Sequence, residues 1–218
     1  MAVPTLLDLF HRLGAKPYDW IYSRGAPWES GPRPALVELV ESGRISPATL
    51  APGLAVDLGC GSGADSIFLA EQGFTVLGLD FSATAIGKAR AAGAAAGLDR
   101  PPVFGELDLL DLATADLVGP FDLFFDGGTI DDFPTSVRPR VADAITAVSR
   151  PGSVLVMWCF FAEPRDLPWF SLQGPSRWGA PPIAPGEESA LFGEHWDIDR
   201  FEPTNAGPHE ACFVMTRR

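Results

Sequence analysis

Apolar and polar positions follow two different periods along most of the chain. From Leu54 onward, short continuous apolar runs are separated by segments of 10 to 16 residues whose apolar positions fall at helical spacing. Continuous apolar runs are typical of strands buried on both faces, and their alternation with helices indicates βαβ units. The predicted strands are 54–58, 75–80, 102–109, 121–126 and 153–161, and the predicted helices are 64–73, 82–97 and 136–150.

The two ends of the chain depart from this alternation. Leu6, Leu7, Phe10 and Leu13 predict a short helix over 4–14. A stretch rich in glycine, proline and tryptophan follows. A second helix is expected over 34–43, because proline suits a helix start and glycine a helix end.

The C-terminal part contains a proline-rich segment and a predicted hairpin. Residues 162–194 show neither a helical nor a strand period. Two runs, 196–203 and 211–218, then read as strands joined through 205–210. The fold class expected is therefore α/β, a doubly wound Rossmann-like sheet of seven strands, mostly parallel with an antiparallel C-terminal hairpin.

Length and composition predict one domain. The chain has 218 residues, of which 46% are hydrophobic and 20% charged, enough apolar material for one sizeable core. We expect one domain over 1–218, with an N-terminal helical lid (1–50), a cofactor-binding core (51–160) and an acceptor-side loop with the hairpin (161–218).

Charge and cysteine content exclude several classes of protein. The net charge is −12, and a surface of that sign repels nucleic acid. The chain start lacks the features of a signal peptide, and no apolar run approaches the roughly 20 residues that span a bilayer. Three cysteines, Cys60, Cys159 and Cys212, form no disulfide or zinc spacing, so we expect a cytoplasmic protein without membrane attachment.

The strongest chemical signal is a glycine-rich turn between the first predicted strand and helix. Asp57 ends the strand, and the turn carries Gly59, Gly61 and Gly63 around Cys60. Glycines let backbone approach a ligand closely, and the following helix offers free N–H groups. The next strand ends at Asp80, where a carboxylate can accept both hydroxyls of a ribose.

The spacing within this turn separates two nucleoside cofactors. Nicotinamide dinucleotides prefer G-x-G-x-x-G, whereas this chain has G-x-G-x-G followed by Asp65 in the first helical turn. A carboxylate there suits the helix dipole but not a neighbouring pyrophosphate. The turn therefore favours a nucleoside without phosphates.

At these residues the chain resembles the class I methyltransferases that use S-adenosylmethionine. AVDLGCGSGADSIFLA is similar to their first motif and LGLDFSATAIGKAR to their second. The resemblance implies S-adenosylmethionine as cofactor. It also implies cofactor contacts from Phe81, from Asp108 and Leu109 in GELDLLDL, and from Asp126 in GPFDLFFDGGTIDDF.

The N-terminal stretch narrows the resemblance to one branch. PWESGPRPALVELVESG resembles the PW-x-x-G-x-P entry of the small-molecule thiol, thiopurine and halide methyltransferases. That likeness implies that Trp20 and Trp28 close over the cofactor, although ordinary packing would explain two tryptophans equally well. It also implies a small-molecule acceptor, either a thiol or an aromatic hydroxyl or amine.

The fourth motif departs from the family pattern and supplies the catalytic candidates. Asp131 and Asp132 follow Gly127-Gly128-Thr129-Ile130, where relatives often carry an aromatic, Cys or His. Either carboxylate could orient or deprotonate an acceptor if its pKa were raised, or simply cap a helix. His195 and His209 are weaker candidates for a base, and we expect no metal because no histidines have ligand spacing.

Two other functions remain compatible with the sequence. A nicotinamide-dependent oxidoreductase would use the same sheet, but the glycine at the sixth position of its motif and a Tyr-x-x-x-Lys pair are both missing here. A class I relative could also bind S-adenosylmethionine without transferring a methyl group, and the departure in the fourth motif leaves that open.

Overall fold

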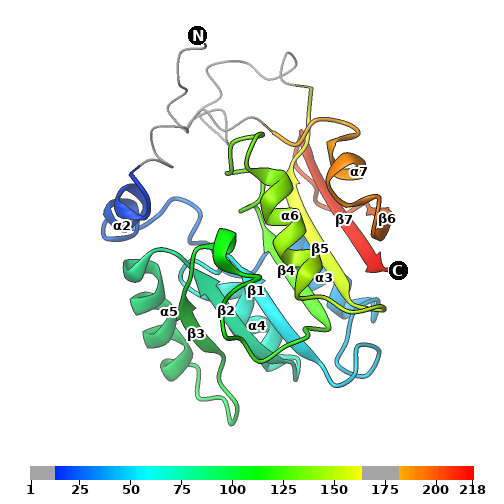
Figure 1. Ribbon diagram of the computed structural model, residues 1–218. Helices are drawn as coiled ribbons and strands as arrows, with labels where there is room; N and C mark the ends of the chain where they lie inside the picture. The colour runs from blue at the N-terminus through cyan, green and yellow to red at the C-terminus, as the bar shows by residue number, and fades with distance from the viewer. Residues whose placement is uncertain (1–12, 164–181) are drawn as a thin grey trace.

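The computed structural model describes residues 13–163 and 182–218, and within them seven strands form one sheet (Figure 1). The order across the sheet is β3-β2-β1-β4-β5-β7-β6. Strands β1 to β5 are parallel, whereas β7 runs antiparallel to both β5 and β6. The fold class expected from the sequence is confirmed. The strands are β1 (Leu54–Leu58), β2 (Thr75–Asp80), β3 (Val103–Glu106), β4 (Leu123–Gly127), β5 (Val154–Phe160), β6 (Trp196–Phe201) and β7 (Glu210–Arg217).

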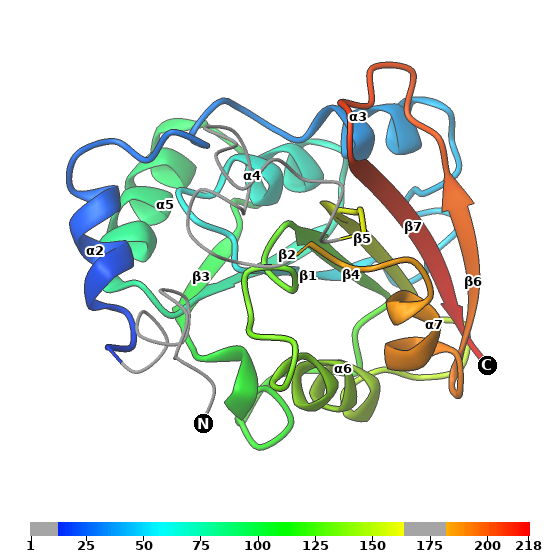
Figure 2. The ribbon, with the colours of Figure 1, turned by 90° about the horizontal axis from the view of Figure 1, so that it is seen from above.

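Helices cover both faces of this sheet, as Figure 2 shows from above. One face carries α3 (Pro34–Glu41), α4 (Ala64–Glu71) and α5 (Ala83–Ala95), and the other carries α6 (Arg138–Ala147) and α7 (Glu187–Phe192). A single turn of 3₁₀ helix, η1 (Leu109–Asp111), lies against α6. Consecutive strand residues point to opposite faces, so Phe124 packs in the core cluster under α6 and Phe125 in the cluster under α3 and α4.

Local sequence explains where the predicted helices begin. The Ser82 hydroxyl accepts the Ala85 N–H over 3.1 Å and caps α5. Pro34 starts α3, and Gly43 follows its end with φ of 72°. These starts and ends match the sequence expectation within two residues.

Two helices lie where no period was recognised. Helix α2 (Lys16–Tyr22) has a proline in its first turn and buries Ile21 and Tyr22. Helix α7 falls within 162–194, so the expectation of no regular element there was wrong. Both are too short, at seven and six residues, for a periodic pattern to emerge. The predicted helix over 4–14 lies almost entirely outside the described residues.

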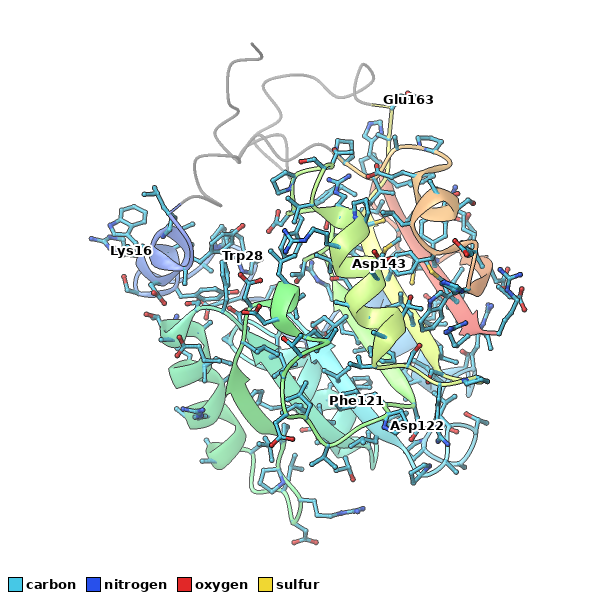
Figure 3. The ribbon with its side chains drawn as sticks, viewed as in Figure 1. Lys16, Trp28, Phe121, Asp122, Asp143 and Glu163 are labelled. Carbon is cyan, nitrogen blue, oxygen red and sulfur yellow. The ribbon has the colours of Figure 1, made fainter. Side chains whose placement is uncertain are left out.

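The amino ends of the central strands are fixed by one buried carboxylate. Asp122 accepts the N–H groups of Gly53 and Leu54 over 3.0 and 2.9 Å and pairs with Arg150. In Figure 3 Asp122 and Trp28 lie at opposite ends of the strands. The carboxyl ends of the strands therefore face the N-terminal segment.

No helix in the described part of the chain is both long enough and apolar enough to cross a bilayer.

Candidate functional site

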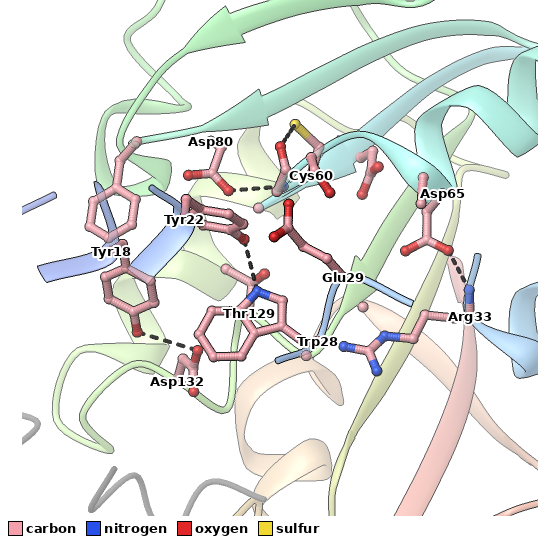
Figure 4. A pocket seen from close by; sticks show the side chains of 18 of the residues that line it. Tyr18, Tyr22, Trp28, Glu29, Arg33, Cys60, Asp65, Asp80, Thr129 and Asp132 are labelled. Carbon is pink, nitrogen blue, oxygen red and sulfur yellow. Dashed lines mark hydrogen bonds between the residues drawn. The ribbon is translucent and has the colours of Figure 1, made fainter. Parts of the chain in front are cut away.

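A cavity of about 490 Å³ opens at the carboxyl ends of β1, β2, β4 and β5 (Figure 4). Helix α2 and the segment 27–33 lie over it. Eleven of the fourteen residues predicted from the sequence to contact the cofactor or act in catalysis line it: Trp28, Asp57, Gly59, Cys60, Gly61, Asp80, Phe81, Asp108, Leu109, Asp131 and Asp132. One crevice thus collects residues from four strand ends, as expected for a doubly wound sheet.

The glycine-rich turn forms the floor of the cavity, and two of its glycines leave no room for a side chain. Gly59 and Gly61 have φ of 70° and 54°. A Cβ on Gly61 would lie 2.6 Å from the Tyr22 hydroxyl, and one on Gly59 would overlap Thr129. Both the backbone conformation and the close neighbours therefore require glycine here.

Asp80 ties this turn to the start of α5. Its Oδ2 accepts the Gly61 N–H over 3.0 Å, and its Oδ1 accepts the Ser82 N–H over 2.8 Å. Burial raises the pKa of Asp80 to about 6, against the lowering effect of these two hydrogen bonds. The carboxylate is nearly buried but borders the cavity, so it can still accept further hydrogen bonds.

Two more carboxylates lie beside the start of α4. The Ser66 hydroxyl donates to Asp57 Oδ2 over 2.6 Å, and burial raises the pKa of Asp57 well above its usual range. Asp65 Oδ1 accepts the Arg33 N–H over 2.6 Å, and burial raises the pKa of Asp65 to about 6. The Asp65 contact joins the loop before α3 to the rim of the cavity.

The N-terminal segment is held over the cavity by polar contacts with α5. Asp19 on α2 accepts the Ser82 hydroxyl over 2.6 Å and the Thr84 N–H over 3.0 Å. Glu29 pairs with Lys88 on α5 over 3.0 Å. The Trp28 indole N–H donates to the Tyr22 hydroxyl over 3.0 Å.

Three aspartates meet at the end of β4. Asp126 is buried, and its Oδ1 accepts the N–H groups of Thr129 and Ile130 over 2.9 and 3.2 Å, which closes the loop after the strand. Asp131 Oδ2 accepts the Phe160 N–H over 2.9 Å. Burial and the neighbouring Asp131 charge raise the pKa of Asp126 well above its usual range.

Asp132 is a cavity carboxyl whose pKa lies near neutrality. Burial, with the charge of Asp131, raises its pKa to about 7. The Tyr18 hydroxyl donates to Asp132 Oδ2 over 3.3 Å, and that bond, with the charges of Arg138 and Arg33, opposes the rise. A carboxyl that titrates near neutrality suits proton transfer.

Arg138 holds the backbone of this loop from beneath. The side chain is buried and donates to the carbonyls of Asp131 over 2.8 Å and Phe133 over 3.0 Å. It also pairs with Glu187 of α7 over 2.9 Å. The position of the two aspartates thus depends on α6 and α7 as well as on β4.

Aromatic side chains form the wall of the cavity beside these aspartates. Trp158 and Phe160 pack edge to face with ring centroids 5.2 Å apart, and Phe133 also lines the cavity. The Arg33 guanidinium lies over the Trp158 ring, 4.3 Å from its centroid. This half of the cavity is suited to a flat ring.

The comparisons with known proteins agree with this geometry. A family described as "Methyltransferase domain" matches residues 55–152. A probable thiol methyltransferase 2 of Arabidopsis thaliana is 33% identical over 165 residues, which cover 73% of this chain and 70% of that protein. The chain belongs to the S-adenosylmethionine-dependent methyltransferases.

Two further similarities have lower identity but comparable or greater coverage. A 2-heptyl-1-hydroxyquinolin-4(1H)-one methyltransferase of Mycobacteroides abscessus is 28% identical over 81% of this chain and 71% of that protein. A structure described under the conversion of a disulfide bond into a thioacetal group during echinomycin biosynthesis is 27% identical, with a TM-score of 0.67 over 93% of this chain and 90% of that chain. Solved methyltransferases of the same fold hold S-adenosylmethionine or S-adenosylhomocysteine. The cofactor of this methyltransferase is therefore S-adenosylmethionine, and its family acts on small molecules.

Three residues named from the sequence lie outside the cavity of this methyltransferase. Trp20 is 58% exposed, because α2 buries its Ile21 and Tyr22 face and leaves Trp20 under Arg24. Gly63 caps α4 beneath Phe104. The third, Asp126, is covered by the loop that its own carboxylate closes. His195 and His209 do not line the cavity either.

Sequence reasoning missed the cavity residues supplied by the N-terminal segment and by β5. Tyr18 and Tyr22 lie four positions apart and share one face of α2, a signal that the pattern Tyr18, Ile21, Tyr22 could have given. Arg33 and Trp158 gave no local signal, since they meet only through the tertiary fold.

Proposed function

We propose that this methyltransferase acts on a hydroxyl group carried by a planar aromatic small molecule. The observation that carries the proposal is the placement of Asp132, whose pKa is about 7, in the same cavity as Trp158 and Phe160. An aromatic hydroxyl must lose its proton as it is methylated, and a nearby carboxylate that titrates near neutrality can accept it.

The cofactor fits the other half of the cavity. Asp80 would accept the ribose hydroxyls, while Phe81, Asp108 and Leu109 would border the adenine. The turn at Gly59 and Gly61 allows the close approach that any side chain would block. When bound there, S-adenosylmethionine supplies a methyl group on a sulfonium, a group already activated for transfer.

The protein's own residues then align the acceptor and take its proton. Phe133, Trp158 and Phe160 would hold the ring and exclude water. The acceptor O–H bond would break as its proton moves to a carboxylate oxygen of Asp132, leaving the electron pair on the acceptor oxygen. A negative charge on Asp131 raises the pKa of Asp132 and so favours transfer of the acceptor's proton to Asp132.

The N-terminal segment would act as a lid within a single domain over 1–218. Trp28 and Tyr22 lie over the glycine turn, and Asp19 and Glu29 fix the segment to α5. Such a cover would keep water from the reacting atoms.

A thiol is the second candidate acceptor, because the Arabidopsis relative is named a probable thiol methyltransferase. A thiol ionises more readily than most hydroxyls and depends less on a base. The two candidates therefore differ in how much each depends on Asp132.

The test uses labelled S-adenosylmethionine with matched acceptors, 1-hydroxyquinolin-4(1H)-one, phenol, thiophenol and aniline, on the wild type, Asp132→Asn and Asp131→Asn. We expect methylated hydroxyl products, a fall of at least about 100-fold with Asp132→Asn, and a smaller fall with Asp131→Asn. Transfer to thiophenol alone, at a rate unaffected by Asp132→Asn, would replace the first candidate with the second.

A further inference from the structure

The cavity contains a cation whose side chain has no hydrogen-bond partner in the described part of the chain. Arg33 uses its backbone N–H to bind Asp65, but its guanidinium donates no hydrogen bond and forms no salt bridge with any residue in 13–163 or 182–218. A guanidinium carries five N–H donors, and those of Arg33 border the cavity. In Figure 4 it points from the start of α3 toward the middle of the cavity.

The guanidinium is nevertheless held in a fixed place. It lies 4.3 Å from the centroid of the Trp158 ring, within the range of a cation–π contact. The backbone bond to Asp65 anchors the residue from the other side. Its donors are therefore preorganised over the face of an aromatic ring.

One glycine makes this arrangement possible. A Cβ on Gly128 would lie 2.9 Å from the Trp158 ring, and the φ of Gly128 is 101°. A side chain at position 128 would displace the Trp158 ring, so this glycine leaves space for the Arg33–Trp158 pair.

The position across the sheet assigns this pair to the acceptor. Asp80 ends β2, at one side of the cavity, whereas Gly127 ends β4 and Trp158 lies on β5, at the other. The pair therefore lies beyond the glycine turn, on the side where Asp131 and Asp132 are found.

We infer that Arg33 and Trp158 form a subsite for an aromatic acceptor that carries an anionic oxygen, with the ring against Trp158 and the oxygen paired with the guanidinium. The inference rests on the proposed function. Arg33 would make the charge-assisted, two-pronged contact that a carboxylate accepts best.

Three carboxyls also face this guanidinium, and their partial protonation lowers the negative charge that an anion would meet. Arg33 lowers the pKa of Asp65, Asp131 and Asp132 against the larger effect of burial, which keeps each of these pKa values raised. Near pH 6 a substantial fraction of Asp65 is neutral. The cavity can then accept a negative group, and binding would be accompanied by proton uptake.

The test compares acceptors that differ only in a carboxylate: thiophenol against 2-, 3- and 4-mercaptobenzoate, and phenol against the three hydroxybenzoates. We expect at least one carboxylated isomer to have a kcat/KM about tenfold or more above its parent. That preference should fall to about one in Arg33→Met and be partly retained in Arg33→Lys. Arg44→Met removes a guanidinium that lies over the Phe201 ring outside the cavity, and it should preserve the preference.

Binding of S-adenosylhomocysteine tests whether Arg33 pairs with the carboxylate of the cofactor instead of that of the acceptor. We expect the affinity of S-adenosylhomocysteine in Arg33→Met to match the wild type, which also shows that the variant is folded. Weaker binding of S-adenosylhomocysteine, with unchanged binding of 5′-methylthioadenosine, would assign the guanidinium to the cofactor's carboxylate and overturn the inference. A wild type without preference for any carboxylated isomer would overturn it as well. Failure of the proposed function would differ, since phenol and the hydroxybenzoates would then not be methylated, whereas the preference among the mercaptobenzoates would still test the Arg33 subsite.

Discussion

The hydroxyl of Tyr18 donates a hydrogen bond to Asp132 Oδ2 over 3.3 Å and joins residues 114 positions apart. The Tyr18 ring also packs edge to face on Phe81, with centroids 5.1 Å apart. One side chain of α2 therefore touches both the proposed base and a residue beside the proposed adenine site. Tyr18 therefore influences both the docking of the N-terminal segment and the pKa of Asp132.

Tyr18→Phe should change the pKa of Asp132 and leave the packing of the ring on Phe81 intact. A hydrogen bond donated to a carboxylate stabilises its charged form, so its loss raises the pKa of Asp132. We expect the acid limb of kcat/KM to move to higher pH by roughly 0.5 to 1. The rate at pH 6.5 should then fall severalfold, with little change at pH 9.

Tyr22→Phe serves as the control for this change. Its hydroxyl contacts Trp28 and the glycine turn rather than Asp132. It should change the affinity for S-adenosylhomocysteine and leave the acid limb in place. An unchanged acid limb in Tyr18→Phe would exclude Asp132 as the group that titrates.

Asp80→Asn should weaken cofactor binding by at least about tenfold, as measured by calorimetry with S-adenosylhomocysteine. The amide keeps one acceptor oxygen, so it cannot bond both Gly61 and Ser82 and also accept a ribose. Glu106→Gln is the matched control. Glu106 lies on β3 in register with Asp80 of β2, but it is exposed and lies outside the cavity. Equal affinity in the two variants would rule out the ribose assignment.

Gly59→Ala should lower the free energy of unfolding by more than about 1 kcal/mol. Its φ is 70°, and the added Cβ would overlap Thr129. Gly87→Ala, on the exposed face of α5 where nothing lies within 4 Å of the new Cβ, should instead stabilise the protein by up to about 1 kcal/mol. Urea denaturation of both variants tests the pair, and destabilisation by Gly87→Ala would contradict this account of the glycines.

The pH dependence of stability follows from the buried carboxyls. Because the folded pKa of Asp80 is about 6, above its unfolded value, the folded state binds more protons between pH 4 and 6. The stability contributed by the protonated form is present below pH 4 and is lost as the pH rises through 6. Asp57 and Asp126 have raised pKa values and act in the same direction.

We expect the free energy of unfolding of the ligand-free protein to fall by at least about 2 kcal/mol between pH 5 and 7. Urea titrations at several pH values measure this slope. Asp126→Asn removes one titrating group and should flatten the curve. Stability that rises over the same interval would show that these carboxyls are ionised in the folded protein.

The sequence predicted the parts of the fold that depend on neighbours along the chain. The turn at Gly59 to Gly63 and the acid at Asp80 were found because strand, turn, helix and the next strand follow one another directly along the chain. Helix α2 was missed because its seven residues show too little of a period. Trp20 was assigned to the cavity because a tryptophan in a lid segment is attractive, yet the orientation of α2 turns it to solvent.

The acceptor half of the site could not be predicted in the same way. Tyr18 meets Asp132, Arg33 meets Trp158, and Arg138 meets Glu187 only after α2, α3 and α7 pack against the sheet. None of these pairs shares a motif or a spacing. The Asp131-Asp132 pair was found, but its raised pKa values come from burial that only the packed structure supplies.

Arg138→Met should be among the most destabilising single changes in the described chain. The methionine fills a similar volume but leaves the carbonyls of Asp131 and Phe133 and the carboxylate of Glu187 without their donor. Removal of one partner from a buried ion pair costs about 3–5 kcal/mol, because the other charge is left uncompensated. Arg140→Met, exposed on the same helix, should change stability by less than about 0.5 kcal/mol.

A double-mutant cycle with Glu187→Gln separates the charge from the backbone contacts. If the uncompensated carboxylate causes most of the loss, Arg138→Met with Glu187→Gln should be more stable than Arg138→Met alone, measured by urea denaturation. The remaining deficit would report the unpaired carbonyls of Asp131, Phe133 and Pro182, and it should be accompanied by a lower methylation rate, since the Asp131-Asp132 backbone would no longer be held. Additive losses in the double variant would show instead that Arg138 and Glu187 stabilise the fold independently.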